Sequence, residues 1–243
     1  MKKLILATAL QLSLATTVVL AAQQTNMNNR AFMSVKVKAD KGEANSQFAL
    51  GGMYFQGISI EKDHAMAASL YRKAAIQGHE KAMFNLAMMY KKGDGVKQDM
   101  NEAISLFGQG AEKGDQKSAI HLAEIYYKGD GVKKDLGKAF ELYKQVADKK
   151  YPIAQYQVGL MYKAGEGTKM DLSKAILYLN KASMQNSEAA QYVLGKMYYD
   201  GDGVKQNKKE AEGLLKKAYL NGKHEAKAIL DKENWIPEQN KQN

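Results

Sequence analysis

The chain has 243 residues, of which 45% are hydrophobic and 26% charged, and its formal net charge is +10. This length and apolar content can bury a large core, which excludes an intrinsically disordered protein as the default class. The chain has no cysteine. Disulfides and lipidation of an N-terminal cysteine are therefore excluded.

Residues 1–22 have the composition of a secretory signal peptide. Lys2 and Lys3 form a short basic region, residues 4–20 are apolar or small, and Ala21 and Ala22 follow. An uncleaved anchor helix is the alternative, but about 17 residues with several Ser and Thr are marginal for crossing a bilayer. We expect export, cleavage and no stable membrane insertion afterwards. Cleavage removes two lysines and no acid, which lowers the net charge from +10 to +8.

Five blocks then repeat every 36 residues without insertion or deletion. A tyrosine, a glycine and an alanine mark the same three positions of each block: Tyr54, Tyr90, Tyr126, Tyr162 and Tyr198; Gly57, Gly93, Gly129, Gly165 and Gly201; Ala67, Ala103, Ala139, Ala175 and Ala211. Such a period predicts a solenoid, in which each unit buries its apolar face by stacking on its neighbours. The blocks span 43–78, 79–114, 115–150, 151–186 and 187–222.

Each block predicts a helix-turn-helix pair. In block 79–114, the apolar residues from Ala82 to Tyr90 recur at spacings of three and four, which is typical of the buried stripe of a helix. The glycines in 92–96 end this first helix. Asp99 then begins a second helix, in a capping box with Glu102.

The periodicity extends beyond both ends of the five blocks. Residues 23–42 are predicted to hold an N-terminal capping helix, because their apolar positions lie one period before those of a second helix. Residues 223–243 are predicted to hold a C-terminal capping helix through Ala226 and Leu230, followed by a polar tail. The predicted fold is all-α: an α-solenoid of five helix-turn-helix repeats with a capping helix at each end.

One motif, Ala-Gln-Tyr-x-(Val/Leu)-Gly-x-Met-Tyr, occurs at 154–162 and 190–198. With the pattern Gly-x-Gly-Val, the capping Asp and Lys-Ala, it resembles the Sel-one-like repeat family, a relative of the tetratricopeptide repeat, over residues 43–222. The resemblance implies a right-handed superhelix of antiparallel helix pairs, used in bacteria largely as exported or periplasmic adaptors for protein partners. Some secreted, cysteine-rich members are associated with penicillin binding and β-lactamase activity, and this chain lacks those cysteines.

By analogy with tetratricopeptide units, the resemblance places the first helices on the concave face, where positions outside the core stripe are candidates for partner contact. One such column varies in residue type, which favours contact over packing: Phe55, Lys91, Tyr127, Lys163 and Tyr199. Further candidates on the same helices are Phe84, Met88, Glu124, Tyr156, Tyr192 and Lys196. Aromatic rings supply anchoring area and lysines favour acidic partners. Another column is also compatible with packing between repeats: Phe48, Phe84, Ile120, Tyr156 and Tyr192.

One lysine recurs in the inner loop of four repeats, at Lys97, Lys133, Lys169 and Lys205, and these residues form a stripe along the loops. Identical charges spaced by stacked repeats are suited to follow an anionic polymer. Acidic residues recur in the same loops and partly offset these charges: Asp94, Asp130, Glu166 and Asp202. A solvated surface is therefore the favoured interpretation of the stripe.

The sequence shows no catalytic, metal-binding or cofactor-binding motif. The four histidines occupy different repeat positions without the spacing of metal ligands: His64, His79, His121 and His224. The run Asp-Gly-Asp-Gly at 200–203 lacks the further acidic ligands of a calcium loop. We expect no enzyme activity, no metal and no cofactor.

The sequence predicts an exported scaffold that binds a protein or peptide partner through its concave surface, in the periplasm or outside the cell. The positive charge favours an acidic partner. Nucleic acid is not expected as a partner, because no reading motif is present, and a monomer is favoured. The alternative is a peptidoglycan-linked or penicillin-recognising, β-lactamase-like envelope protein.

Overall fold

A computed structural model describes residues 30–236, and every regular element in this range is a helix. The chain divides into two compact units, with the division between Asp115 and Gln116. The predicted signal peptide and the predicted polar tail lie outside the described residues. Within the described range, no helix combines the length and the apolar character needed to cross a membrane.

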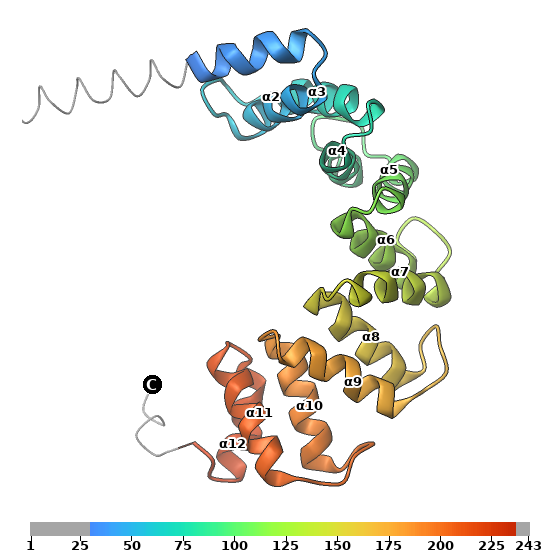
Figure 1. Cartoon of the computed structure of the whole chain (residues 1–243), viewed down its shortest axis with the longest axis vertical. Coiled ribbons are helices and arrows are strands. Elements are labelled where there is room, and N and C mark those ends of the chain that lie inside the picture. Colours follow the sequence, from blue (N-terminus) through green and yellow to red (C-terminus); the bar gives the residue numbers. More distant parts are fainter. Residues whose placement is uncertain (1–29, 237–243) are drawn as a thin grey trace, which may run out of the picture. The chain divides into compact units, whose positions relative to one another are not determined.

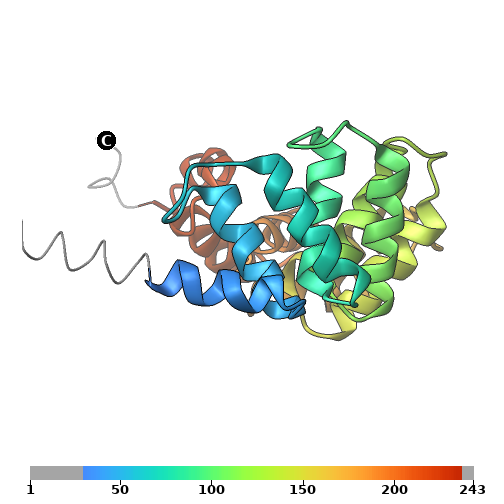
Figure 2. The same ribbon diagram turned by 90° about the horizontal axis from the view of Figure 1, so that it is seen from above.

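The first unit contains the helical residues 30–40 and two helix pairs, which we number repeats one and two. The pairs are α2 (Ala44–Gln56) with α3 (His64–Ile76), and α4 (Glu80–Lys92) with α5 (Met100–Glu112). Both views show α3 beside α2, and α3 also packs against α4 (Figures 1 and 2). Phe32 and Val35 pack on a cluster formed by Ala39, Leu50 and Leu70, so the segment 30–40 closes this end of the core.

The second unit contains repeats three to five and a terminal helix. Its pairs are α6 (Gln116–Lys128) with α7 (Leu136–Asp148), α8 (Pro152–Ala164) with α9 (Leu172–Ser183), and α10 (Glu188–Asp200) with α11 (Lys208–Leu220). A 3₁₀ turn at His224–Ala226 and α12 (Lys227–Lys232) follow. Leu230 is fully buried against Leu215 and Ile236 and closes this end. We call α2, α4, α6, α8 and α10 the first helices and their partners the second helices.

Every second helix begins at a capping side chain, as predicted. The side chains of five equivalent residues accept hydrogen bonds from the first turn of their helices: Asp63, Asp99, Asp135, Asp171 and Asn207. The predicted capping box at Asp99 forms only in part. The backbone N–H of Asp99 donates to the carbonyl oxygen of Tyr90 at 3.0 Å, so it is not available to the Glu102 side chain.

The loops inside repeats two, four and five each rest on the preceding repeat through a glycine: Gly95, Gly167 and Gly203. Gly167 has a φ of 69°, and a Cβ at this position would overlap the carbonyl oxygen of Leu136, at the start of α7. Gly203 occupies the same position one repeat later, and its Cβ would lie 2.6 Å from the Cβ of Leu172, at the start of α9. Glycine is required here both for its backbone conformation and for this close approach.

A buried glutamine in three of the first helices connects helices through its amide. The Gln155 Nε2 donates to the carbonyl oxygen of Ala147 at 3.3 Å, and its Oε1 accepts from Gln185 at 2.8 Å. Gln47 and Gln191 make the equivalent pairs of contacts. Repeats two and three have Met83 and Ala119 at this position instead. Because burying an amide without hydrogen-bond partners costs free energy of folding, the glutamine occurs where a second amide can donate to it.

We expect Gly167→Ala to destabilise the chain by at least about 2 kcal/mol, because the added methyl group combines an unfavourable φ with a steric overlap. Gly213→Ala is the matched control. Gly213 lies within α11 with nothing within 4 Å of its added Cβ, so this change is expected to stabilise by about 0.5–1 kcal/mol. Urea unfolding followed by circular dichroism measures both. Equal effects at the two sites would contradict the close approach of the loop to α7.

Candidate binding site on the first helices

The structure places all the predicted contact residues on first helices. Ten of them are half-buried: Phe55, Phe84, Met88, Lys91, Glu124, Tyr127, Tyr156, Lys163, Tyr192 and Tyr199. Lys196 is exposed. Half-burial means that these side chains also contact the chain itself, and the contacts decide how much of each remains for a partner.

The column that varies in residue type contacts the following repeat. The Tyr127 hydroxyl donates to the Glu166 carboxylate at 2.7 Å, and the Lys163 ammonium forms an ion pair with Asp202 at 2.6 Å. The Tyr199 hydroxyl donates to Glu233, beside α12, at 2.6 Å. These three side chains therefore connect repeats through their polar ends. The sequence signal for this was present, since Glu166 and Asp202 each follow their partner by 39 residues.

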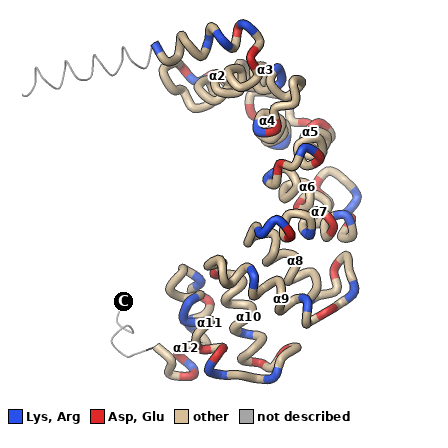
Figure 3. The backbone as a smooth tube through the Cα atoms, in the orientation of Figure 1, with Lys and Arg blue, Asp and Glu red and all other residues tan. Residues whose placement is uncertain are grey.

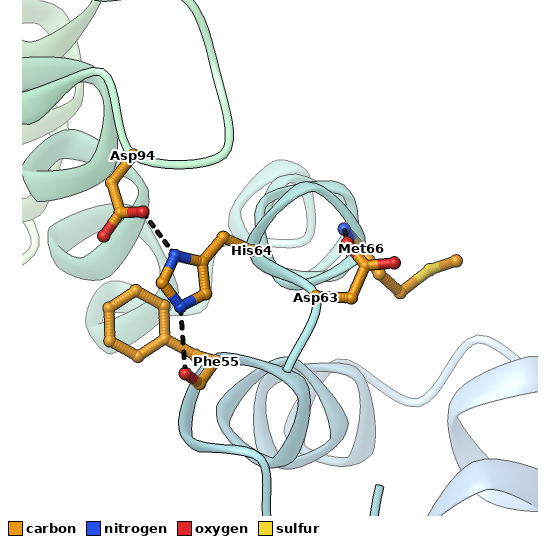
Figure 4. A network of polar contacts seen from close by, with 5 residues as sticks. All are labelled: Phe55, Asp63, His64, Met66 and Asp94. Atoms are coloured by element: carbon orange, nitrogen blue, oxygen red, sulfur yellow. Dashed lines mark hydrogen bonds and ion pairs between the residues drawn. The ribbon is translucent and has the colours of Figure 1, made fainter. Parts of the chain in front are cut away.

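Phe55 holds the same position but has no hydrogen-bond donor, and His64 supplies one. The His64 ring stacks on Phe55 with centroids 4.7 Å apart, and its Nδ1 contacts the carboxylate of Asp94 (Figure 4). Its Nε2 lies 3.2 Å from the carbonyl oxygen of Phe55. Both ring nitrogens thus face oxygen atoms that can accept a hydrogen bond. Sequence analysis did not identify His64 in this role.

A cavity of about 230 Å³ lies beside this network, between α2 and α4. Its lining residues come from both helices, from α3 and from the loop after α4: Phe55, Gln56, Tyr71, Asn85, Met88, Met89, Lys92 and Asp94. Two predicted contact residues, Phe55 and Met88, are among them. The cavity is smaller than the about 300 Å³ or more of typical small-molecule pockets, and its size suits one side chain of a partner.

The second predicted column packs between helices. Phe48 stacks on His79 with ring centroids 4.5 Å apart, and Phe84 lies 5.9 Å from Phe107. Tyr156 and Tyr192 pack on the buried clusters around Leu194 and Leu215 respectively. His79 also caps α4 by accepting a hydrogen bond from Ala82, and burial lowers the pKa of His79.

The loop lysines have no acidic partner in residues 30–236. Lys97, Lys133, Lys169 and Lys205 are all exposed, and none of them forms an ion pair there. Figure 3 shows both signs of charge along the loops of the second unit. Glu166 and Asp202 in these loops pair with first helices instead. In the part of the chain that the structure describes, no group of three or more His, Cys, Asp or Glu residues could hold a metal ion.

The sequence model of the Sel1 repeat family matches residues 44–79, 80–115, 116–151, 152–187 and 188–223, and the chain belongs to this family. Sel1 repeat proteins are generally non-enzymatic scaffolds that mediate protein–protein interactions. The α-solenoid of five helix-pair repeats predicted from the sequence is therefore confirmed.

Several solved structures are similar to this chain, among them the following two. A Sel1 repeat protein from Oxalobacter formigenes has a TM-score of 0.71 and 29% identity, over 78% of this chain and 75% of that one. The protein c5321, a protective antigen of uropathogenic Escherichia coli with an SLR fold, has a TM-score of 0.68 and 28% identity. That match covers 80% of this chain and 50% of the antigen. No curated protein matches the chain.

Glu233 connects the last repeat to the terminal helix in a way that depends on pH. Hydrogen bonds from Lys208 and Tyr199 lower the pKa of Glu233 below its ordinary 4.5. A carboxyl group with a lower pKa in the folded state stabilises the fold above its unfolded pKa, and this stabilisation is lost as the pH falls through the folded value. The contribution of Glu233 is therefore lost below about pH 4.5.

We expect Tyr199→Phe to lose less stability than the unchanged chain when the pH falls from about 6 to about 3, because one hydrogen bond to the Glu233 carboxylate is already missing. Tyr198→Phe is the control, since it removes a hydroxyl from the neighbouring position, away from Glu233. Thermal melts across this pH range measure the difference. Identical pH profiles for Tyr199→Phe and Tyr198→Phe would contradict the role of the Tyr199 hydroxyl.

Proposed function

We propose that this chain is an exported, non-enzymatic scaffold that binds a protein or peptide partner through the concave surface of its first helices. The observation that carries the proposal is the cavity of about 230 Å³ between α2 and α4. Its walls combine the Phe55 ring and Met88 with the polar side chains of Asn85 and Asp94. An apolar side chain of a partner can be buried there while its backbone meets the polar rim.

The walls of this cavity are held in place before any partner binds. Phe55 is fixed by stacking on His64, which in turn contacts Asp94. Three of the elements that supply the lining are helices of a packed core. Because few side chains would need to be ordered on binding, the entropy cost of association is low. This supports a role in recognition.

The proposed location is the periplasm or the cell exterior. It is supported by the basic start at Lys2 and Lys3, the apolar run at 4–20 and the small residues Ala21 and Ala22. The net charge of +8 after cleavage favours a partner with net negative charge through long-range attraction. We propose that the chain acts as a monomer.

We expect Met88→Glu to weaken partner binding at least about tenfold, because it places a charge in the cavity that would receive an apolar side chain. Met66→Glu is the control, since Met66 is 43% exposed on α3 and does not line the cavity. Partners captured from envelope extracts by the unchanged chain are identified by mass spectrometry and then titrated with both variants. Thermal melts show whether each variant is folded. A folded Met88→Glu chain with unchanged affinity would move the binding site away from this cavity.

We also expect the chain in the cell envelope to begin after Ala21 or Ala22, because the small residues there follow the basic and apolar regions of a signal peptide. Intact mass measurement of the chain purified from the envelope fraction checks this. Retention of residues 1–22 on that material would contradict cleavage.

A further inference from the structure

The cavity between α2 and α4 has the volume of a two-ring aromatic side chain. Its volume is about 230 Å³. A cavity of about 150 Å³ is enough to hold benzene, so this one is larger by a factor of about one and a half. Indole, the ring system of tryptophan, exceeds benzene in size by about the same factor. A smaller side chain would leave part of the space empty and lose contacts with the walls.

Three side chains of the cavity wall favour an aromatic occupant. One face of the Phe55 ring stacks on His64, with centroids 4.7 Å apart, and the rest of the ring lines the cavity. Aromatic pairs gain free energy beyond that of the area they bury. Met88 and Met89, both on α4, add thioether groups, which also make favourable contacts with aromatic rings.

One polar group of the wall can accept a further hydrogen bond. The Asp94 carboxylate contacts the His64 Nδ1 through its Oδ1, and Figure 4 shows it beside the same histidine ring as Phe55. A carboxylate has about four acceptor positions, so Asp94 keeps acceptors for a ligand. Tyr71 and Asn85, two other polar side chains of the wall, are hydrogen-bonded to each other. An occupant with a single N–H donor therefore matches this wall.

Other classes of side chain match the cavity less well. A purely aliphatic or phenyl side chain would cover the Asp94 carboxylate without pairing with it, which costs free energy. A cationic side chain would be repelled by Lys92, which also lines the cavity. An anionic one would be repelled by Asp94 itself. A neutral, two-ring aromatic group with one N–H donor meets all of these conditions.

We propose that this cavity binds a tryptophan side chain of the partner, an inference that rests on the proposed function. The indole ring packs against Phe55 and Met88, and its N–H donates to the Asp94 carboxylate. Tryptophan is among the residues that contribute most to the binding energy of protein interfaces. A single such anchor gives the scaffold a specific contact that is independent of its net charge.

The test uses N-acetyltryptophanamide, a neutral probe that carries the side chain without any partner. It is titrated into the whole chain with isotope-labelled methionine methyl groups, and the methyl signals are followed by NMR. The variants Met88→Leu and Met89→Leu assign the two signals of the cavity. Met66 lies on α3, does not line the cavity and serves as the internal reference. We expect saturable shifts at Met88 and Met89 and none at Met66.

Two related probes separate the ring from its donor. N-acetylleucinamide keeps an apolar side chain and lacks the ring, and we expect it to bind at least about tenfold more weakly. The analogue of N-acetyltryptophanamide that is methylated on the indole nitrogen keeps both rings and lacks the donor. We expect it to bind at least about fivefold more weakly, because the Asp94 carboxylate is then covered without a partner. Both comparisons use the unchanged chain.

A pair of variants locates the binding on the chain. Phe55→Leu keeps an apolar side chain but removes the aromatic face, and we expect it to weaken binding of N-acetyltryptophanamide at least about fivefold. Phe32→Leu is the matched control. Phe32 is also half-buried, packs on the cluster around Leu50 and does not line the cavity, so binding is expected to be unchanged. Thermal melts show whether each variant is folded.

The proposal is overturned if N-acetyltryptophanamide gives no saturable shift at Met88 and Met89, or if either related probe binds equally well. It is also overturned if Phe32→Leu weakens binding as much as Phe55→Leu. Failure of the proposed function looks different. A captured partner whose binding responds to Met88→Glu would preserve the scaffold function even when tryptophan is rejected as the occupant. Specific binding of N-acetyltryptophanamide without any captured partner would preserve the site and reject the scaffold function.

Discussion

The close approach of the inner loops of repeats two, four and five to the preceding repeat is the constraint on which the rest of the structure depends. Gly167 and Gly203 rest on the starts of α7 and α9, where a Cβ would collide with the chain. Because the loop must pass at this distance, its neighbouring acidic residues, Glu166 and Asp202, are brought to the first helix of the preceding repeat. The same contact therefore sets both the stacking of repeats and the polar chemistry beside the first helices.

The repeats share one backbone conformation but differ in the side chains that complete this contact. Tyr127 and Lys163 meet the loop acid directly, whereas Phe55 lacks a donor and His64 meets it instead. A phenylalanine at this position also leaves its ring available to line a cavity. Variation within one column thus produces a partly apolar cavity in the first unit and direct contacts of Tyr127 and Lys163 with loop acids in the second, with little change to the fold.

The buried amides show a second way in which repeats differ. Gln47, Gln155 and Gln191 each satisfy both ends of their amide, to a preceding carbonyl oxygen and to a later amide donor. Met83 occupies the same place in repeat two and needs no partner. A buried amide with only one of its hydrogen-bonding groups satisfied would destabilise the fold relative to either arrangement. The two amides of a pair therefore occur together.

The sequence by itself determined the helix pairs, their ends and the stacking of five repeats. Those features depend on local patterns, since the apolar spacing, the αL glycines and the capping residue Asp99 act within a few residues of the backbone. Only the tertiary structure decided that Tyr127 and Tyr199 donate to Glu166 and Glu233. Contacts between residues more than thirty positions apart depend on the path of the intervening loop and on the packing angle between helices, and residue type alone specifies neither.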